Sequence, residues 1–465
     1  MARNVNNLVR SLPAVEAVLR DPGASGLVDR FGRRAVADAI RLVIAGARKR
    51  MLRAGSAEGV DCSTSAIAAL AGGHLADAAR PRLRRVVNAT GIILHTGLGR
   101  AMMPGDARSN LSLVSGYCNL QQDLETGRRD TREECIRGLV KELTGAQDVA
   151  VVNNNAGATF LVLAALARGR EVVISRGELI EIGGSFRLPD IMAESGAILR
   201  EVGTTNKTHL KDYEKAVGPG TAMLLKAHKS NYRIVGFTKE VGIAEIAAVG
   251  RKHKVPVVDD LGCGALVGLE QFGLEHECTV RESLEAGADV ALFSTDKLIG
   301  GPQGGMIAGR ADLIEKIRSH PLYRILRVCK LTLGALEATL GLFRSPDLLA
   351  KKHPVYRMIA KTMPEMDSQA RELMASIASA RPDWQIEVSK EVSFLGGGSL
   401  PETEMPSFAV RIKAPRVAAD KLALALRMAD TPVVSRVADG RVILDMRTVF
   451  PEDFADILSA VGRQR

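Results

Sequence analysis

Lys297 has the most distinctive setting for chemistry in this sequence. It follows an apolar run that ends in Phe293-Ser294, and the turn residues Gly300-Gly301-Pro302 come after it. A lysine between a buried strand and a tight turn cannot easily extend into water, which favours a neutral amine and Schiff-base chemistry. Ser294 is placed to donate to a phosphate at the same site. The alternative is a surface lysine on a loop.

Two further groups suit a phosphorylated pyridine cofactor. Asp259-Asp260 follows the apolar run Val255–Val258, and a carboxylate at a strand end can keep a pyridine nitrogen protonated, although it can also simply cap the next element. Asn153–Ala158 leads from a strand into a helix through small residues. Free N–H groups at such a helix start bind phosphate, although a plain turn with an asparagine cap has the same pattern.

The order of these groups, helix start, aspartate and then lysine, predicts pyridoxal 5′-phosphate as the cofactor. The dinucleotide fingerprint G-x-G-x-x-G does not follow the first strand, and the phosphate loop G-x-x-x-x-G-K-[ST] does not occur. No cysteine pair has the spacing of a structural zinc site, so no metal is predicted.

Alternating short apolar runs and helical stretches position these groups. They predict an α/β fold with a mostly parallel seven-stranded sheet. The predicted strands are Val149–Val152, Val172–Ser175, Ala197–Val202, Ala222–Leu225, Val255–Val258, Val290–Phe293 and Gly305–Ala308. After Thr332 we expect a long helical region and then a small α+β domain. That domain would contain Ser407–Lys413, a helix, Val433–Val437, an Asp439-Gly440 hairpin turn, Val442–Met446 and a final helix.

Positive charge is concentrated near the N-terminus. The chain has a formal net charge of +10, and Met1–Thr90 holds fifteen Lys and Arg against seven Asp and Glu. Helical spacing puts Val36, Ile40, Val43, Ile44 and Ala47 on one face. Arg34, Arg41 and Arg48 lie on the opposite face, which suits contact with phosphates, although a solvated basic helix with no partner has the same pattern.

Length and composition exclude several classes of protein. A chain of 465 residues with 46% hydrophobic and 25% charged residues is neither a single small module nor a disordered or fibrous chain. No apolar stretch reaches the roughly 20 residues of a membrane span, and the first thirty residues lack the apolar core of a secretory signal. We therefore expect a cytoplasmic protein with no membrane partner.

In many ordered segments the chain resembles the bacterial L-seryl-tRNA(Sec) selenium transferases, or selenocysteine synthases. The resemblance covers nearly the full length. The matching segments are Leu12–Glu16, Val87–Gly91, His95–Ala101, Asn153–Ala158, Ser175–Gly184, Glu201–Asn206, His228–Tyr232, Asp259–Gly264, Ser294–Gly305 and His320–Arg327.

The resemblance implies a fold-type I pyridoxal phosphate enzyme. It would convert L-seryl-tRNA(Sec) to L-selenocysteinyl-tRNA(Sec) with selenophosphate, through a cofactor aldimine and an aminoacrylyl-tRNA intermediate. It further implies three domains, with helical tRNA-binding residues 1–80, catalytic residues 81–335 and α+β residues 336–465. A homodecamer built as a ring of dimers is implied as well, with the active site between subunits.

The resemblance also implies roles for individual residues. Lys297 is the Schiff-base lysine, Asp296 its acidic catalytic neighbour and Asp260 the partner of the pyridine nitrogen. The expected cofactor-binding residues are Asn154, Asn155, Ala156, Ser230, Asn231 and Ser294, besides Asp260 and Lys297. Those expected to hold the selenium donor are Arg100, Arg324 and Arg327, with Thr204 and Thr205 as further candidates.

Two alternatives remain open from the sequence. A lyase of the same fold acting on a small phosphorylated amino sugar would have Lys297 and Asp260 but no use for the basic N-terminal segment. An RNA-binding protein that kept the fold without catalysis would not need Lys297, Asp260 and the arginines together.

Overall fold

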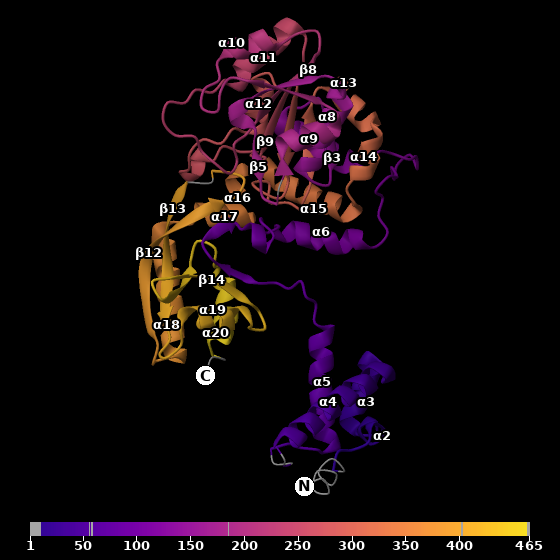
Figure 1. The fold of residues 1–465 in the computed structure, drawn as a ribbon, viewed down its shortest axis with the longest axis vertical. Helices are drawn as coiled ribbons and strands as arrows, with labels where there is room; N and C mark the ends of the chain where they lie inside the picture. The colour runs from indigo at the N-terminus through magenta and orange to yellow at the C-terminus, as the bar shows by residue number, and fades with distance from the viewer. Residues whose placement is uncertain (1–10, 55, 57–58, 185, 401–402, 463–465) are drawn as a thin grey trace. The chain divides into compact units, whose positions relative to one another are not determined.

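The computed structural model describes residues 11–54, 56, 59–184, 186–400 and 403–462. The chain forms two compact units, Met1–Arg85 and Val86–Arg465 (Figure 1). Each has an apolar core of its own.

The first unit consists of helices. They are α2 (Val15–Leu19), α3 (Pro22–Phe31), α4 (Arg33–Ala54) and α5 (Thr64–Ala79). Asp21 caps α3 by accepting the Gly23 N–H, and it also accepts the Thr64 hydroxyl, which joins the start of α3 to the start of α5. The helical N-terminal domain predicted from the sequence is therefore present.

Helix α4 buries the apolar face that its spacing predicts. Val36, Ile40, Val43, Ile44 and Ala47 are all buried, and most of them pack with residues of α2, α3 and α5. The opposite face carries Arg34, Arg41 and Arg48, all exposed, with Arg41 paired to Asp38 at 2.5 Å. The amphipathic character of this segment is confirmed.

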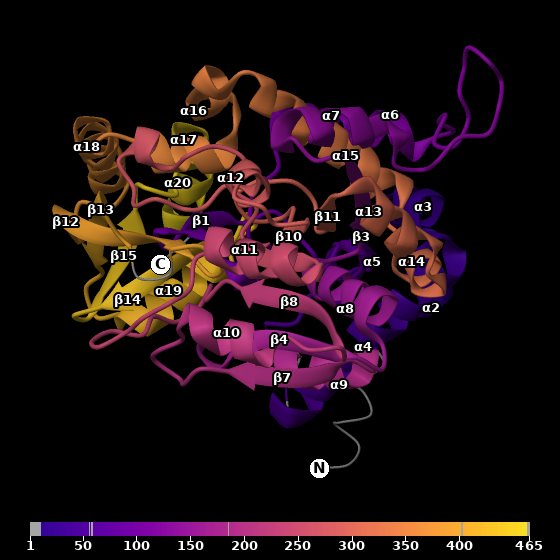
Figure 2. The same cartoon turned by 90° about the horizontal axis from the view of Figure 1, so that it is seen from above.

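The second unit is built on a seven-stranded sheet in the order β3-β11-β10-β9-β8-β4-β7. Its strands are β3 (Asp148–Val152), β4 (Glu171–Ser175), β7 (Ile198–Val202), β8 (Thr221–Ala227), β9 (Val257–Gly262), β10 (Val290–Ser294) and β11 (Gly305–Gly309). Strand β11 is antiparallel to both of its neighbours, β3 and β10, and the other neighbouring pairs of this sheet are parallel. Figure 2 shows β8, β4 and β7 side by side. The mostly parallel seven-stranded sheet is confirmed.

One predicted strand is displaced. We expected Val255–Val258 to end before the two aspartates, but β9 runs from Val257 to Gly262 and includes both. Pro256 cannot donate a ladder hydrogen bond, and Gly262, with φ +69°, ends the strand. Asp259 and Asp260 therefore point to opposite faces of the sheet rather than lying beyond its edge.

Helices cover both faces of this sheet, as a parallel sheet requires. On one face lie α8 (Asn155–Ala167), α9 (Leu188–Ser195) and α13 (Ala311–Ser319). The other face is covered by α7 (Glu134–Thr144), α10 (Leu210–Ala216), α11 (Ile243–His253) and α12 (Val280–Glu285). Successive residues of the edge strand β3 alternate between cores on the two faces, with Val149 and Val151 in one and Ala150 and Val152 in the other.

A six-stranded sheet lies beside the first within the same unit, in the order β1-β14-β15-β13-β12-β2 (Figure 1). Its strands are β1 (Val87–Ala89), β2 (Ile92–Leu94), β12 (Gln385–Gly396), β13 (Glu404–Lys413), β14 (Val433–Ala438) and β15 (Arg441–Asp445). One side packs on α18 (Met363–Ala380), α19 (Ala419–Arg427) and α20 (Phe454–Gly462). The α+β character is confirmed, and the sheet takes two strands from residues 87–94.

The hairpin prediction holds in this sheet, but three of its six strands, β1, β2 and β12, were not predicted. Asp439 and Gly440 both have positive φ, +52° and +67°, and they join β14 to β15. We expected only helix between Thr332 and Ser407, whereas Gln385–Gly396 forms β12. This strand pairs along its length with β13. The ladder of hydrogen bonds to β13 stabilises this segment as a strand rather than as the helix that we expected.

The remaining helices connect the two sheets. They are α6 (Gly105–Ser115), α14 (Pro321–Leu326), α15 (Lys330–Gly341), α16 (Leu349–Lys352) and α17 (Pro354–Ala360). Two short strands, β5 (Glu181–Ile182) and β6 (Phe186–Arg187), pair with each other. Among the described residues no helix combines the length and apolarity needed to cross a membrane.

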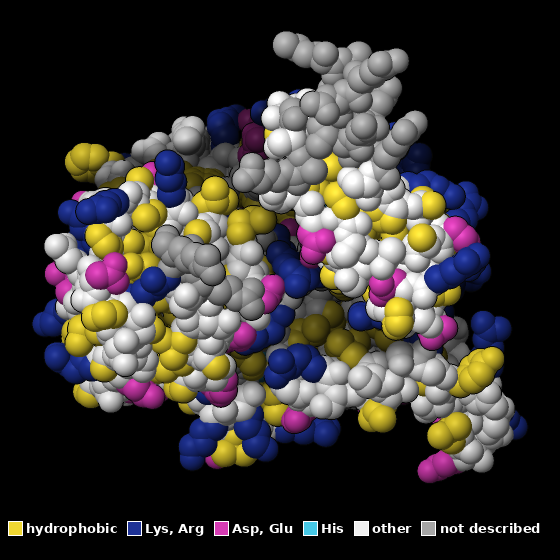
Figure 3. Space-filling view, turned by 90° about the horizontal axis from the view of Figure 1, so that it is seen from below, with side chains coloured by type: hydrophobic (Ala, Val, Ile, Leu, Met, Phe, Trp, Pro, Cys, Tyr) yellow, Lys and Arg dark blue, Asp and Glu magenta, His cyan; other side chains and the backbone are white. Residues whose placement is uncertain are grey.

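Basic side chains are spread over the surface drawn in Figure 3. On that face Lys and Arg lie at several places, with acidic and apolar side chains between them. The charge pattern of this face therefore does not by itself single out an RNA-binding region.

Candidate active site

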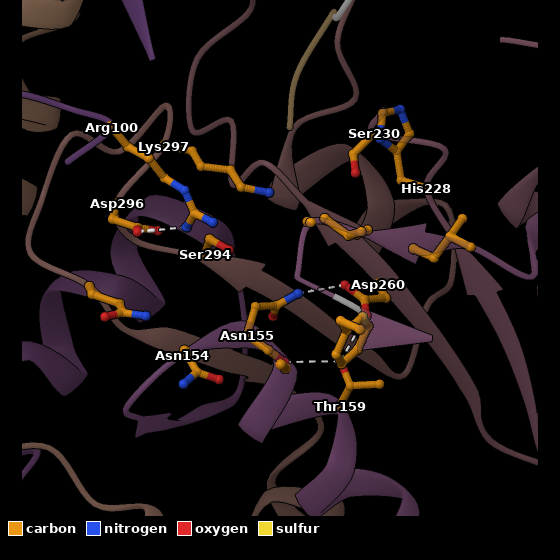
Figure 4. Close-up of a pocket in the computed structure, with 17 residues that line it drawn as sticks. Arg100, Asn154, Asn155, Thr159, His228, Ser230, Asp260, Ser294, Asp296 and Lys297 are labelled. Carbon is orange, nitrogen blue, oxygen red and sulfur yellow. Dashed lines mark hydrogen bonds and ion pairs between the residues drawn. The ribbon is translucent and has the colours of Figure 1, made fainter. Parts of the chain in front are cut away.

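A cavity of about 290 Å³ lies where β9 and β10 end and α8 begins (Figure 4). It brings together many of the residues predicted from the sequence. Those in its wall are Arg100, Asn154, Asn155, Ala156, Ser230, Asp260, Ser294, Asp296 and Lys297. The carboxyl ends of strands meet at this edge, which is where open α/β sheets bind their ligands.

Lys297 lies in the turn between β10 and β11 and is only 6% exposed. Its carbonyl accepts the Gly300 N–H, and Gly300 has φ +68°. A side chain at Gly300 would run into the imidazole of His353, which is buried and hydrogen-bonded to the Ile299 carbonyl at 2.8 Å. This turn therefore needs a glycine, and it fixes the backbone that carries the lysine.

The lysine amine is enclosed by glycine backbone. A Cβ on Gly398, in the segment after β12, would stand 2.5 Å from Lys297 Nζ, and Gly398 has φ +101°. Burial lowers the pKa of the Lys297 amine, and the nearby Arg100 guanidinium lowers it further, against the opposing effect of Asp296 and Asp260. The setting favours the neutral, nucleophilic amine that Schiff-base formation requires.

Asp260 is held by two residues of α8. Asn155 Nδ2 donates to Asp260 Oδ1 at 2.7 Å, and the Thr159 hydroxyl donates to Oδ2 at 2.8 Å. Burial raises the pKa of Asp260, while these two hydrogen bonds and the Lys297 charge act to lower it. A protonated ring nitrogen in the cavity would give this buried carboxylate the opposite charge that it lacks.

The start of α8 faces the same cavity. Asn154 is the N-cap, and its side chain accepts the Gly157 N–H at 2.7 Å, so the asparagine-cap interpretation is correct for that residue. Asn155 and Ala156, at the first positions of the helix, line the cavity together with Ser294 at the end of β10. The helix start and this hydroxyl together suit a phosphate group.

Arg100 and Asp296 form an ion pair in the cavity wall. Arg100 Nη1 lies 2.7 Å from Asp296 Oδ2, with the two side chains 31% and 12% exposed. Arg100 has φ +63°, a conformation that non-glycine residues rarely adopt. The pair places one cation and one carboxylate directly beside Lys297.

Some predicted residues lie outside the cavity of their own chain. Asn231 is exposed and donates to the Glu181 carbonyl at 2.7 Å. Thr204 and Thr205 are exposed in the loop after β7, where the Thr204 N–H donates to the Lys207 carbonyl at 2.8 Å. The structure does not bring these three residues to Lys297.

Arg324 and Arg327 are also exposed and do not line the cavity. Their backbone is nevertheless tied to the start of the site, because Arg327 forms an isolated bridge with Val152 and the Leu326 carbonyl accepts the Asn153 N–H at 2.9 Å. The backbone at Leu326 and Arg327 thus lies beside the residues that lead into α8, while the Arg324 and Arg327 side chains are exposed.

Sequence reasoning missed three residues with polar side chains in the cavity wall, Thr159, His228 and Gln303. Thr159 could have been found, because it stands one helical turn after Asn155 and so shares its face. His228 and Gln303 lie in segments that carry the family resemblance, but their spacing gave them no role.

The polar atoms of the cavity fit a ligand with several polar groups. Asn155 Oδ1, His228 Nδ1 and Ser230 Oγ are buried and have no hydrogen-bond partner among the described residues. Buried polar atoms are rarely left unpaired unless something else contacts them. An amine, a buried carboxylate, a helix start and these atoms form a donor set that fits pyridoxal phosphate.

Comparison with known proteins gives a consistent result. A family model described as L-seryl-tRNA selenium transferase matches residues 86–450, and one described as selenocysteine synthase N terminal matches residues 9–48. The chain is 45% identical over 459 residues to the L-seryl-tRNA(Sec) selenium transferase of Moorella thermoacetica, covering 98% of this chain and 96% of that protein. The protein of the same name from Methylocella silvestris is 45% identical over 458 residues, covering 97% of each chain.

Among solved structures, D-glucosaminate-6-phosphate ammonia-lyase is similar in fold. The TM-score is 0.56 at 18% sequence identity, and the match covers 82% of this chain and 95% of that chain. The structural similarity shows that the two proteins share the fold-type I architecture. At so low a sequence identity it carries no information about the substrate.

Proposed function

Because this chain belongs to the L-seryl-tRNA(Sec) selenium transferase family, we propose that it converts L-seryl-tRNA(Sec) to L-selenocysteinyl-tRNA(Sec) with selenophosphate. The cofactor is pyridoxal 5′-phosphate. The observation that best supports the proposal is the meeting of Lys297, Asp260 and the start of α8 in one cavity.

The cofactor would be held by the residues of that cavity. Lys297 would bind its aldehyde carbon, Asp260 its ring nitrogen, and Asn154, Asn155, Ala156 and Ser294 its phosphate, with Ser230 also in the wall. When bound, pyridoxal phosphate supplies an electron sink for the charge left when a proton leaves Cα of the seryl group.

The chain's own residues would then move protons and hold charge. The buried Lys297 amine is placed to take the proton from Cα, and its lowered pKa favours the neutral form that can do so. Asp260, fixed by Asn155 and Thr159, would hold the proton on the ring nitrogen. Overall, the serine Cβ–O bond breaks and the hydroxyl leaves as water, and selenium from selenophosphate bonds to Cβ. The Se–P bond then breaks with uptake of a water by phosphorus, and phosphate is released.

The anionic selenium donor needs cations beside the lysine. Arg100 supplies one cation. Because Arg100 already pairs with Asp296, the selenium donor would compete with that carboxylate for the guanidinium. Asp296 would act there as the acidic neighbour of the lysine. A multiply charged anion calls for further arginines, which suits Arg324 and Arg327, with Thr204 and Thr205 as additional contacts.

Exposed predicted residues are candidates for contact with a cavity of another subunit. Arg324, Arg327, Thr204, Thr205 and Asn231 do not line the cavity of their own chain, so we propose that they act on the cavity of a neighbouring subunit. A homodecameric ring of dimers, as the family resemblance implies, would provide such neighbours.

The N-terminal unit is the proposed tRNA-binding domain. Its helix α4 presents Arg34, Arg41 and Arg48 on an exposed face. We assign residues 1–80 to this role, 81–335 to catalysis and 336–465 to the α+β domain. A substrate made for translation also implies that the enzyme works in the cytoplasm.

The direct test supplies the purified holoenzyme with seryl-tRNA(Sec) and selenophosphate and identifies the esterified amino acid by mass spectrometry. We expect selenocysteine from the wild type and none from Lys297→Ala. Absence of conversion, together with release of ammonia from a phosphorylated amino sugar, would instead support the lyase alternative.

A further inference from the structure

His228 presents a buried, unpartnered nitrogen to the Lys297 cavity. It follows β8 directly, and its backbone N–H donates to the Asp260 carbonyl at 2.9 Å, so its position is fixed relative to the aspartate. Nδ1 is buried and has no partner among the described residues, although the side chain as a whole is 37% exposed. A nitrogen left unpaired in a cavity wall indicates contact with a ligand.

Glu277 accounts for the orientation of the ring. His228 Nε2 lies 3.7 Å from Glu277 Oε1, on the side away from Nδ1. Glu277 is itself 3% exposed and accepts hydrogen bonds from Cys263 Sγ at 3.0 Å and Ser399 Oγ at 3.3 Å. The carboxylate is therefore held from two sides and cannot easily move away from the imidazole.

Of the polar groups of the cofactor, only the phenolic oxygen has not yet been given a partner in the cavity. Pyridoxal phosphate carries a ring nitrogen, an aldehyde carbon, a phosphate arm and a phenolic oxygen. On the ring the phenolic oxygen is next to the aldehyde carbon, on the side opposite the phosphate arm. In Figure 4 His228 and Ser230 lie across the cavity from Asn154 and Ser294. With the phosphate at the start of α8, the phenolic oxygen would face His228 and Ser230.

We propose that His228 is a cofactor-binding residue whose Nδ1 hydrogen-bonds the phenolic oxygen of pyridoxal phosphate, and that Glu277 is a positioning residue that holds the imidazole in place. This inference rests on the proposed function only for the cofactor at Lys297. It does not depend on the tRNA or on the selenium donor.

The experiment measures cofactor binding by the cofactor-free protein. Pyridoxal phosphate is titrated into wild type, His228→Ala, His228→Asn and His228→Gln, and the visible absorbance gives both Kd and the position of the band. The Asn amide nitrogen is attached at Cγ like Nδ1, whereas the Gln amide nitrogen reaches further, toward the place of Nε2.

We expect His228→Ala and His228→Gln to raise Kd about tenfold, the effect of losing one hydrogen bond to a charged group. The visible band should shift in both variants, because the phenolic oxygen is part of the chromophore. His228→Asn should bind nearly as wild type. Glu277→Gln, whose single amide oxygen can keep only one of the acceptor contacts to Cys263 and Ser399, should shift the band in the same direction by a smaller amount.

The exposed His276, paired with Glu270, supplies a matched control of the same chemistry. His276→Ala should change neither Kd nor the band. Thermal unfolding of each cofactor-free variant separates lost binding from lost folding. Wild-type Kd and an unshifted band in His228→Ala would overturn the proposal, as would a His228→Asn variant that resembles Ala rather than wild type.

The outcome is separable from that of the proposed function. If the wild type fails to convert seryl-tRNA(Sec), the transferase assignment is wrong, but the expected differences in Kd and band position between the wild type and the His228 variants remain. A wild type that binds no pyridoxal phosphate at Lys297 would overturn both.

Discussion

Asp259 and Asp260 are consecutive residues of β9 whose carboxylates point to opposite faces of the sheet. Asp260 accepts from Asn155 and Thr159 of α8 in the cavity, whereas Asp259 accepts the Ser283 hydroxyl of α12 at 2.6 Å. The two-residue period of a strand separates them. One carboxylate therefore faces the ligand cavity, and the other is confined to the core.

Asp260→Asn should lower kcat by at least about 100-fold, on the scale of losing one preorganised electrostatic partner of the reacting system. The amide can hydrogen-bond the ring nitrogen but cannot balance its positive charge. The rate of selenocysteinyl-tRNA formation at saturating cofactor measures this. Asp259→Asn is the matched neighbour and should keep the wild-type rate; equal losses in both variants would contradict the assignment.

Asp259→Asn should instead change stability with pH. Burial raises the pKa of Asp259 to about 6, against about 3.9 in the unfolded chain. The carboxyl is protonated in both states below pH 4, so it has no effect there. Between pH 4 and pH 6 the unfolded chain ionises while the buried carboxyl stays protonated, so the free energy of unfolding falls across this window and levels off above it. The variant should therefore be more stable by about 1–3 kcal/mol at pH 7.5 and unchanged near pH 4.

Urea unfolding of the cofactor-free protein at the two pH values measures the effect. Ser283→Ala provides the opposite control, because losing its hydrogen bond removes an interaction that favours the ionised carboxylate. That variant should lose more stability at pH 7.5 than at pH 4. If Asp259→Asn gains the same stability at both pH values, the pKa of the Asp259 carboxyl is not raised in the folded protein.

Lys297 should react as an unusually nucleophilic lysine in the cofactor-free protein. Because burial lowers its pKa, the neutral amine is present at lower pH than in an ordinary lysine, whose pKa is about 10.4. Labelling with pyridoxal and cyanoborohydride at pH 7.5, followed by peptide mass spectrometry, should modify Lys297 well before Lys252. Lys252 is 66% exposed and serves as the internal reference. Equal rates and equal pH profiles at both positions would refute the expectation.

Chains carrying Lys297→Ala and chains carrying Arg324→Ala with Arg327→Ala should complement each other when co-expressed. Each homomeric variant should be inactive or nearly so. If the arginines act on a neighbour's cavity, random mixing restores complete sites, up to roughly a quarter of wild-type activity for a site shared by two subunits. No recovery in mixed assemblies would place the arginines within their own chain's site or outside the reaction.

Arg34, Arg41 and Arg48 should contribute to tRNA affinity through phosphate contacts. Replacing any one with Ala should weaken binding and reduce the slope of log K against log salt by about 1. Filter binding across a salt series measures the slope. Lys211→Ala, an exposed cation of the other unit, should leave the slope unchanged. Three unaltered slopes would remove α4 from the RNA interface.

The sequence was sufficient for the central sheet, because most of its strands are short, largely buried apolar runs, although the edge strand β7 is mostly exposed. It also placed Lys297 and Asp260 at one edge, since carboxyl ends of parallel strands converge. The end of β9 was misjudged because carboxylates are rare in buried strands, and here Ser283, Asn155 and Thr159 satisfy them.

Other features depend on distant partners that no local pattern reveals. Strand β12 mixes polar with apolar residues and is stabilised by pairing with β13. The unpaired nitrogen of His228 could be recognised only once Glu277 and Asp260 were located around it. The exposure of Arg324 and Arg327 is likewise a property of the folded chain, not of the spacing between them.

Strands β1 and β2 pair with segments more than 290 residues further along, β1 with β14 and β2 with β12. During synthesis, β1 must therefore wait until the ribosome has passed Ala438 before it gains its neighbour. Met1–Arg85 is followed directly by β1, whose pairing with β14 is among the last steps in forming the six-stranded sheet. The helical N-terminal segment can thus fold early, whereas β1, next to its attachment point, gains its strand partner only after β14 has been made.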